Sequence, residues 1–523
     1  MDDTPNLDSE ETMPPEILLG PRRRNFIIFA SLLALFLGAL DALVMSAATP
    51  TIVADLGGLH LYSWVYSAYF LARAVALPVF GKLADIYRSR QLFIISILIF
   101  ILGSVLAGLA QSMMQLILSR VLQGVGAGGN FALVYIVLAD ISSPEQRGKT
   151  LSLGSFIWGL ASVLGPTFGG FVVTYLSWRW IFFINVPLGA ISLVGIAWFL
   201  VEVREKKKEA AIDYWGAVTL STTILGLLTV FLMAGRTYDW ISLQIFGLSL
   251  IAIAAGIAFY FAEKNAREPI LSLEFFGRRG FSIGNGSAFL ASFTIFALFA
   301  YTPLFIQGAL GKTPLEMSIA MLTMSLGWSI GALVCGQMVN RFGQKPSTIF
   351  GCLCLVVGSG VLLTYSADTS LTNCSIVLAI VGVGMGFVSM ATLLVVQDSL
   401  DLSDLGVATS SHQFARTLGG AIGVGVSGSF VTMTLSSTME SLMSTKLKDL
   451  PPFLDSEIKQ NIENIFRPEI QALLSPEIQQ TMQAAVARGV LTVFWITFFA
   501  SLLCLLLSIM IPVQSVARSK EVR

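Results

Sequence analysis

Charged side chains stand inside long apolar runs of this sequence, among them Asp41, Arg73 and Arg120. A charge removed from water costs free energy unless it is paired or neutralised, so such a residue marks a functional site by default. Counted along helices at about 1.5 Å per residue, the three lie at similar depths, roughly 9–13 Å from one end. The spacing predicts a carboxylate held between two guanidiniums, with Gln123 one turn from Arg120 as a hydrogen-bond relay.

A carboxylate in this setting is suited to proton coupling. Burial and neighbouring cations act in opposite senses on the pKa of a carboxyl group, so a movement of helices would change how tightly Asp41 holds a proton. Proton coupling requires a group whose proton affinity differs between two states of the protein. The alternative is a fixed ion pair that only locks the helices together, with Arg73 holding Asp41 permanently ionised.

The composition places these residues in a membrane. The chain has 523 residues, of which 55% are hydrophobic and only 12% are charged, and its mean hydropathy is +0.77. Soluble proteins have roughly 25% charged residues. Apolar runs of about 20 residues, the length that a helix needs to cross the hydrocarbon, recur along the chain. The predicted fold class is therefore an all-α integral membrane protein. The formal net charge of zero gives no argument for a nucleic-acid partner.

The apolar runs predict fourteen transmembrane helices. They cover about residues 25–49, 62–80, 91–110, 115–138, 150–175, 180–201, 215–233, 243–261, 282–306, 318–339, 347–365, 375–397, 407–433 and 489–512. An even number of helices places both termini on one side of the membrane. Lys and Arg gather in the short connections on that side, which favours a cytoplasmic position for both ends in a cell membrane.

A charged stretch between two apolar runs occurs twice. Residues 81–90 begin with Gly81 and contain three cations, and residues 336–345, shifted by 255 positions, begin with Gly336 and end on Lys345. The repeat predicts two pseudo-symmetric six-helix bundles with a substrate cavity between them. The alternative is a chance match between two connections.

The resulting organisation has six parts. We expect a disordered cytoplasmic N-terminus at 1–24, an N-terminal bundle at 25–201, two inserted helices at 215–261, a C-terminal bundle at 282–512 that contains an extracytoplasmic loop at 435–488, and a cytoplasmic tail at 513–523.

The first copy of the charged stretch is suited to act as a latch. Gly81 lets two helix ends approach closely, and Asp85 can accept hydrogen bonds from a neighbouring helix N-terminus or pair with a cation. Candidate cations are Arg88, Arg90 and Arg147. Such a latch would favour one of two rocking states. The alternative is a connection whose positive charge only sets the orientation of the chain.

An aromatic face is predicted on the first helix of the second bundle. Phe289, Phe293, Phe296 and Phe299 are spaced by three or four residues, and Phe296 stands 255 positions after Asp41. Proton chemistry is therefore expected in the first bundle only. A cavity wall of this kind would suit flat, lipophilic or cationic substrates, although packing or lipid contact would produce the same pattern. Two further candidates for contact with substrate are Gln307 and Arg416.

Ordered motifs carry a resemblance to a known family. The chain resembles the major facilitator superfamily in Gly81 to Asp85, in Arg120 to Gly128, and in Gly165, Pro166, Gly169 and Gly170. The stretch Ser177 to Gly189, the pair Leu40-Asp41 and the fourteen spans resemble its fourteen-helix drug:proton antiporter family. Ile86 and Arg88 depart from the family pattern, where an Arg and a Gly are usual.

The resemblance implies a secondary active transporter that exports hydrophobic, cationic or amphipathic compounds in exchange for protons by alternating access. The glycine and proline motif at 165–170 goes with export in the family. A second possibility is a dedicated exporter or uptake carrier of one metabolite. A polytopic enzyme or sensor is a third, but the two histidines, His60 and His412, fall on opposite sides of the membrane.

The expected partners follow from this function. We expect a small-molecule substrate, protons and the lipid bilayer, with a monomeric protein that is not an enzyme. No cofactor or metal is expected, and no phosphate-binding motif of ATP-driven pumps occurs.

Overall fold

The computed structural model describes residues 20–56, 62–202, 213–234, 238–266, 269, 273–312, 314–366, 368–401, 404–445 and 476–512. These residues form helices, and their one β-bridge is the isolated pair Ala234 and Tyr238. The predicted all-helical membrane fold is confirmed. Three parts of the predicted organisation lie outside the described residues: 1–19 of the N-terminus, 446–475 of the long loop, and the tail at 513–523.

The N-terminal bundle contains six spans. Its helices are α2 (Pro21–Leu56), α3 (Tyr62–Ile86), α4 (Ser89–Gly108), α5 (Met113–Asp140), α6 (Pro144–Tyr175), and α7 (Trp180–Phe183) with α8 (Asn185–Phe199), which together form one span. Two helices follow, α9 (Tyr214–Met233) and α10 (Leu243–Asn265), and then the short 3-10 helix η2 (Leu273–Gly277).

The C-terminal bundle also contains six spans. They are α11 (Arg279–Leu304) with the π-helical turn η3 (Phe305–Ala309), α12 (Pro314–Phe342), α13 (Gln344–Leu362), α14 (Leu371–Asp398), α15 (Leu405–Thr445) and α18 (Pro476–Ile509). In the described part of the chain, eleven helices are long and apolar enough to cross a membrane. The others, α3, α6 and α15, are helices through which the two bundles meet.

Several helices are longer than the apolar runs that predicted them. α15 continues to Thr445 and α18 begins at Pro476, so both extend into the segment 435–488. An apolar run marks only the part of a helix that lies in hydrocarbon, whereas the backbone hydrogen bonds of a helix continue into polar sequence beyond it.

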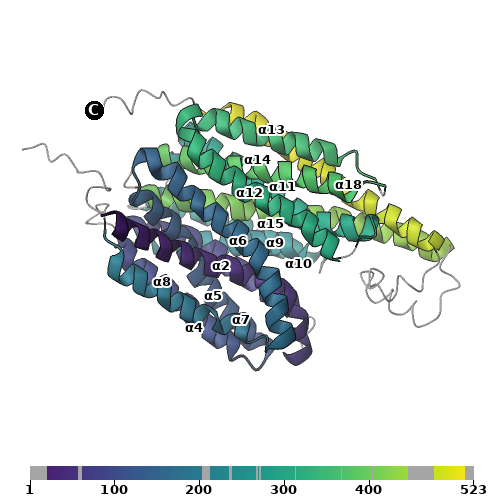
Figure 1. Cartoon of the computed structure of the whole chain (residues 1–523), viewed down its shortest axis with the longest axis horizontal. Coiled ribbons are helices and arrows are strands. Elements are labelled where there is room, and N and C mark those ends of the chain that lie inside the picture. Colours follow the sequence, from purple (N-terminus) through teal and green to yellow (C-terminus); the bar gives the residue numbers. More distant parts are fainter. Residues whose placement is uncertain are drawn as a thin grey trace, which may run out of the picture.

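The two bundles repeat the same packing pairs (Figure 1). In the first, α2 packs on α6 and α5 packs between α3 and α4; in the second, α11 packs on α15 and α14 packs between α12 and α13. Across the interface, α3 packs on α15 and α6 packs on α12. α9 contacts both α3 and α15, so it covers one side of the line along which the bundles meet.

Glycines set the distance between the bundles. A Cβ atom on Gly81 would overlap Ser410 and Gly406 of α15, and a Cβ on its counterpart Gly336 would overlap Ser152 and the carbonyl of Gly148 in α6. Each of these crossings therefore depends on the absence of a side chain. We call the end of the molecule where they lie the basic face, because the chain connections there carry most of the loop cations: Arg22, Arg23, Arg24, Lys82, Arg88, Arg90, Arg147, Lys149, Arg278, Arg279, Arg341 and Lys345.

Glycines also allow close packing within a bundle. On α14, Gly382 lies against the carbonyl of Met324 and Gly386 against the carbonyl of Trp328, both on α12. A side chain at either position would push two buried helices apart.

We expect Gly382→Ala to lower the free energy of unfolding by about 1–3 kcal/mol, because the new methyl group overlaps a backbone carbonyl. The matched control is Gly247→Ala on α10, where a Cβ has no atom within 4 Å. This control should be neutral or stabilise by about 0.5–1 kcal/mol, as Ala replaces Gly in a helix. Thermal unfolding of the purified protein measures both variants. Equal melting temperatures for the two would contradict the packing described here.

Candidate functional site

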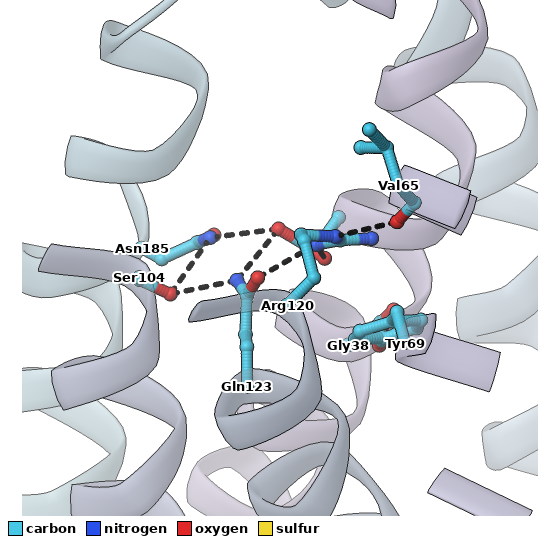
Figure 2. Close-up of polar contacts among 8 residues, drawn as sticks. Gly38, Val65, Tyr69, Ser104, Arg120, Gln123 and Asn185 are labelled. Carbon is cyan, nitrogen blue, oxygen red and sulfur yellow. Dashed lines mark hydrogen bonds and ion pairs between the residues drawn. The ribbon is translucent and has the colours of Figure 1, made fainter. Parts of the chain in front are cut away.

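Asp41 and Arg120 form a buried ion pair in the N-terminal bundle (Figure 2). Asp41 lies on α2 and is 1% exposed; Arg120 lies on α5 and is fully buried. Nη1 of Arg120 donates to Oδ2 of Asp41 and, over 2.6 Å, to Oε1 of Gln123. The structure thus brings together Asp41, Arg120 and Gln123, which were predicted to act as a group.

The second carboxylate oxygen of Asp41 is held by two amides. Nε2 of Gln123 donates to Oδ1 over 2.8 Å, and Nδ2 of Asn185 donates to the same atom over 3.2 Å. Both amides also reach Oγ of Ser104, at 2.8 and 3.3 Å. Four helices, α2, α4, α5 and α8, therefore meet at one carboxylate.

Asn185 and Ser104 are members of this site that sequence reasoning did not assign. Asn185 stands in the stretch Ser177 to Gly189, which carries part of the family resemblance. That resemblance assigns no chemical role to the Asn185 amide. Ser104 carried no signal, because a serine in an apolar run commonly hydrogen-bonds to its own helix.

Arg120 is enclosed on its other side by α3. Its guanidinium lies 4.2 Å from the ring centroid of Tyr69, and its Nε donates to the carbonyl of Val65 over 3.3 Å. The hydroxyl of Tyr69 donates to the carbonyl of Gly38 over 3.0 Å, which ties α3 to α2 one turn from Asp41. Nη2 of Arg120 is buried without a hydrogen-bond partner. The arrangement compensates the charge of Asp41 and leaves one donor of Arg120 unused.

Arg73 is not part of this group, so the prediction of a carboxylate between two guanidiniums is wrong. Its guanidinium lies 4.2 Å from the ring centroid of Phe131 and 5.3 Å from that of Trp158. Phe131 is eleven residues, or about 16 Å, further along α5 than Arg120. The backbone of Arg73 packs against Gly128 of α5, eight residues or about 12 Å beyond Arg120, whereas Arg120 lies level with Val65 of α3. Depth counted along single helices therefore placed Arg73 at the wrong level, because it did not include how the helices are shifted against one another.

Asp85 caps a helix of the other bundle. Its Oδ1 accepts from the backbone N–H of Gly406 over 2.9 Å and its Oδ2 from that of Val407 over 3.0 Å. These N–H groups belong to the first turn of α15, where a helix has unsatisfied donors and a partial positive charge. The carboxylate is 2% exposed. Gly81, one turn earlier on α3, provides the close approach that brings Asp85 to α15.

The three cations suggested as partners of Asp85 lie elsewhere. Arg88 is exposed. Arg90 donates to the carbonyl of Ala197 on α8, and its backbone N–H donates to Glu202 over 2.8 Å. Arg147 pairs with Asp398 at the end of α14, with 3.4 Å between Nη1 and Oδ1. Arg147 thus forms a second polar contact between the bundles at the basic face.

The glycine and proline motif lies on the α2 side of α6. A Cβ on Gly165 would overlap Leu43, so this glycine allows α6 to pack on α2 close to Asp41. Gly169 is buried on the same helix. Pro166 and Gly170 also lie in α6, but their surroundings are outside the described part of the chain.

The predicted aromatic wall is divided by the structure. Phe296 lies 6.2 Å from the ring centroid of Trp328, and the guanidinium of Arg416 lies 5.3 Å from the same ring. The backbone of Phe293 packs against Gly423 of α15, so this position contributes to a helix contact. Gln307 lies in η3, about 16 Å beyond Phe296 along the helix. Phe296 and Arg416 therefore belong to one cluster, and Gln307 does not.

A second ion pair lies at the end of the N-terminal bundle that is opposite to the basic face. Asp55, at the end of α2, accepts from Nε1 of Trp178 over 3.0 Å and from Nη1 of Arg179 over 2.9 Å. These contacts, the Trp178 hydrogen bond first, hold the pKa of Asp55 below its usual range. Both donors lie in the stretch Ser177 to Gly189, which therefore positions Asn185 from one end.

Two repeated six-helix bundles that meet through glycine crossings, with a buried ion pair inside one of them, are an arrangement found in membrane transporters. The sequence profile of the Major Facilitator Superfamily matches residues 30–424. The chain belongs to this superfamily.

Known proteins similar to this chain agree with that assignment. It is 33% identical to the multidrug transporter protein MdtP of Bacillus subtilis over 483 residues, which cover 92% of this chain and 89% of that protein. It is 32% identical to multidrug resistance protein 3 of Bacillus subtilis, over 80% of this chain and 82% of that one. The proton:xylose symporter XylE has the same fold, with a TM-score of 0.59 and 15% identity over 93% of this chain and 95% of that chain.

We expect Arg120→Met to lower the free energy of unfolding by about 3–5 kcal/mol, because it leaves a buried carboxylate without its cation. The matched control is Arg179→Met, which removes an exposed partner of Asp55 and should cost about 0–1 kcal/mol. The double variant Asp41→Asn with Arg120→Met should recover part of the loss, since no uncompensated charge remains. Melting temperatures of the purified variants measure these effects; a double variant less stable than Arg120→Met would contradict the assignment.

We expect Asp85→Ala to loosen the contact between α3 and α15. The reporter is Val407→Cys, whose side chain is 3% exposed in the structure. Loss of a helix cap of about 1–2 kcal/mol should raise the rate of maleimide labelling of this cysteine by about fivefold to thirtyfold. Arg88→Ala, an exposed change in the same connection, is the control and should leave the rate unchanged. An unchanged labelling rate in Asp85→Ala would show that the cap does not hold the bundles together.

Proposed function

We propose that this protein exports hydrophobic and amphipathic small molecules in exchange for protons, by alternating access between its two bundles. The observation that carries the proposal is the carboxylate of Asp41, held in the bundle interior by one guanidinium and two amides. Two relatives carry multidrug names, which supports export of drug-like compounds. In this function the protein is a carrier and catalyses no covalent step.

Asp41 is suited to carry the proton because, among the described residues, Arg120 is the one cation that compensates its ionised form. Arg120 compensates the charge of Asp41, and its own position depends on Tyr69 and Val65 of α3. When α3 moves against α2 and α5, this guanidinium is withdrawn or restored, and the carboxyl group binds or releases a proton. The amides of Gln123 and Asn185 can hydrogen-bond to either form of the carboxyl group.

The contacts at the basic face correspond to one end state of the transport cycle. Asp85 caps α15, Arg147 pairs with Asp398, and Gly148 packs against Gly336. We assign this face to the cytoplasm, because Lys and Arg of short connections gather there. Both termini are then cytoplasmic, and the state is closed toward the cytoplasm. Opening requires Asp85 to release the first turn of α15, which makes the cap a conformational latch between two rocking states.

The remaining features of the function are expectations from the sequence. The protein is placed in the cell membrane as a monomer, because the two bundles of one chain already complete the interface between them.

The test is substrate transport in proteoliposomes with an imposed proton gradient. A panel of anionic, neutral and cationic dyes is offered to the full-length protein, and dye movement and lumenal pH are recorded together. We expect gradient-dependent transport of at least one dye with proton movement in the opposite direction. Asp41→Asn should reduce both signals to the level of protein-free vesicles, because Asn cannot exchange a proton.

The control variant is Asp368→Asn, which changes an exposed acid in the connection between α13 and α14 of the other bundle. It should transport at the rate of the unmodified protein. If Asp41→Asn retained gradient-dependent transport, Asp41 would not be the coupling residue; if no dye moved with the gradient in the unmodified protein, proton-coupled export would be refuted.

A further inference from the structure

Two arginines approach each other across the interface between the bundles. Arg73 lies on α3 in the N-terminal bundle and is 6% exposed, and Arg416 lies on α15 in the C-terminal bundle and is partly buried. The two guanidiniums are near enough to repel each other, and Tyr135 of α5 lies near both of them. Like charges that repel each other are held together here by the fold.

Each arginine rests on a tryptophan beside the same helix crossing. Arg73 lies over Trp158 of α6 and Arg416 over Trp328 of α12, both at 5.3 Å. The next residue after each tryptophan, Gly159 and Ser329, forms the contact where α6 crosses α12. The two arginine–tryptophan pairs therefore flank one point of the interface, with one pair contributed by each bundle.

The charges of these arginines are not neutralised within the described residues. Among these residues, neither guanidinium has a carboxylate partner. The Nε atoms of Arg73 and Arg416 are buried without a hydrogen-bond partner, and so is Nε2 of Gln413. Gln413 accepts from Nη1 of Arg416 over 3.1 Å, so its unused amide belongs to the same cluster. All three of these unpaired atoms are hydrogen-bond donors, so the cluster is suited to bind a ligand that supplies hydrogen-bond acceptors.

The aromatic rings at this place do not favour a cationic ligand. The face of a tryptophan ring attracts a cation, but here the rings of Trp158, Trp328 and Phe131 already carry guanidiniums of the protein. A positive ligand would meet two fixed positive charges before it reached a free ring face. The expectation that this aromatic region serves cationic compounds is therefore replaced by the opposite charge preference.

We propose that Arg73, Arg416 and Gln413 form the substrate site and that it takes an organic anion: a carboxylate or sulfonate attached to an aromatic or lipophilic body. The anionic group accepts from the two guanidiniums and the amide, and the body packs against Phe296 and Phe299, whose rings are partly exposed beside Trp328. This assignment deepens the proposed transport function and rests on it for its physiological meaning.

The position of the site also links it to the proton site. Arg73 and Tyr69 stand one turn apart on α3, and Tyr69 stacks on Arg120 of the Asp41 pair. A ligand that pulls on Arg73 thus acts on the same helix turn that encloses Arg120. The binding of an anion and the release of a proton are thereby coupled through one rigid element.

The experiment compares two dyes that share a xanthene ring system, fluorescein as the anion and rhodamine 6G as the cation. Binding to the full-length protein in nanodiscs of zwitterionic lipid is followed by fluorescence polarisation, without a proton gradient. We expect fluorescein to bind at least about tenfold more tightly than rhodamine 6G, since a hydrogen bond to a charged group contributes at least this factor. Arg416→Gln and Arg73→Gln should each remove most of this preference.

Conservative and distant variants separate charge from folding. Arg416→Lys keeps the positive charge and should keep most of the preference for fluorescein. Arg179→Gln removes a cation at the far end of the N-terminal bundle and should change nothing. The melting temperature and the monodispersity of every variant are measured, and binding is compared only among variants that match the unmodified protein in both. Loss of binding then cannot be assigned to unfolding.

The proposal would be overturned by tighter binding of rhodamine 6G, by no binding of fluorescein to the unmodified protein, or by an unchanged preference in both Gln variants. A parallel series in nanodiscs with phosphatidylglycerol identifies the source of the anion. If that lipid alone abolishes fluorescein binding, the site holds a lipid headgroup and the assignment to a transported solute is wrong. Because no gradient is used, failure of Asp41 to couple protons would leave these binding results unaffected.

Discussion

The cost of placing a charge in hydrocarbon governs this structure. Asp41 is tolerated inside the N-terminal bundle because Arg120, Gln123 and Asn185 replace the water that its carboxylate would lose. To do so they must come from separate helices, so the need to compensate one carboxylate fixes the mutual positions of α2, α5 and α8. The same requirement makes the site sensitive to helix movement, because any movement that withdraws Arg120 changes the free energy of the ionised form of Asp41.

Glycine crossings provide the second constraint, since they allow helices of the two bundles to approach closely. Gly81 against α15 and Gly336 against α6 make equivalent contacts in the two halves, each with small residues of the facing helix, and Asp85 adds two hydrogen bonds to α15. An interface of long side chains would have to unpack before it opened. At the basic face the glycine crossings, the Asp85 cap and the Arg147–Asp398 pair are short contacts that can form or separate together, which is what a rocking carrier needs.

The buried charges of the protein differ between the interior of the first bundle and the interface between the bundles. Inside the first bundle the acid and the cation are matched, whereas at the interface Arg73 and Arg416 stand without an acid among the described residues. An acid paired with a cation needs no ligand to compensate its charge, whereas two cations without an acid favour the binding of an anion. α3 connects the two places, because it carries both Tyr69, which encloses Arg120, and Arg73.

Much of this molecule follows from the order of its residues alone. Apolar runs of membrane length, interrupted at regular places, determined the helical class and the number of spans; the repeat of 81–90 at 336–345 indicated two halves; and the isolation of Asp41 and Arg120 in apolar sequence marked them as partners. Only the tertiary structure decided where the long side chains end. In the structure Arg73 contacts Phe131 and not Asp41, and Asn185 and Ser104 join the group around the Asp41 carboxylate. Asp85 caps the N-terminus of a helix and does not pair with one of the predicted arginines. The reason is that a count along one helix gives neither the level at which it packs against its neighbours nor the direction of a long side chain, and both depend on which neighbouring helix faces the residue.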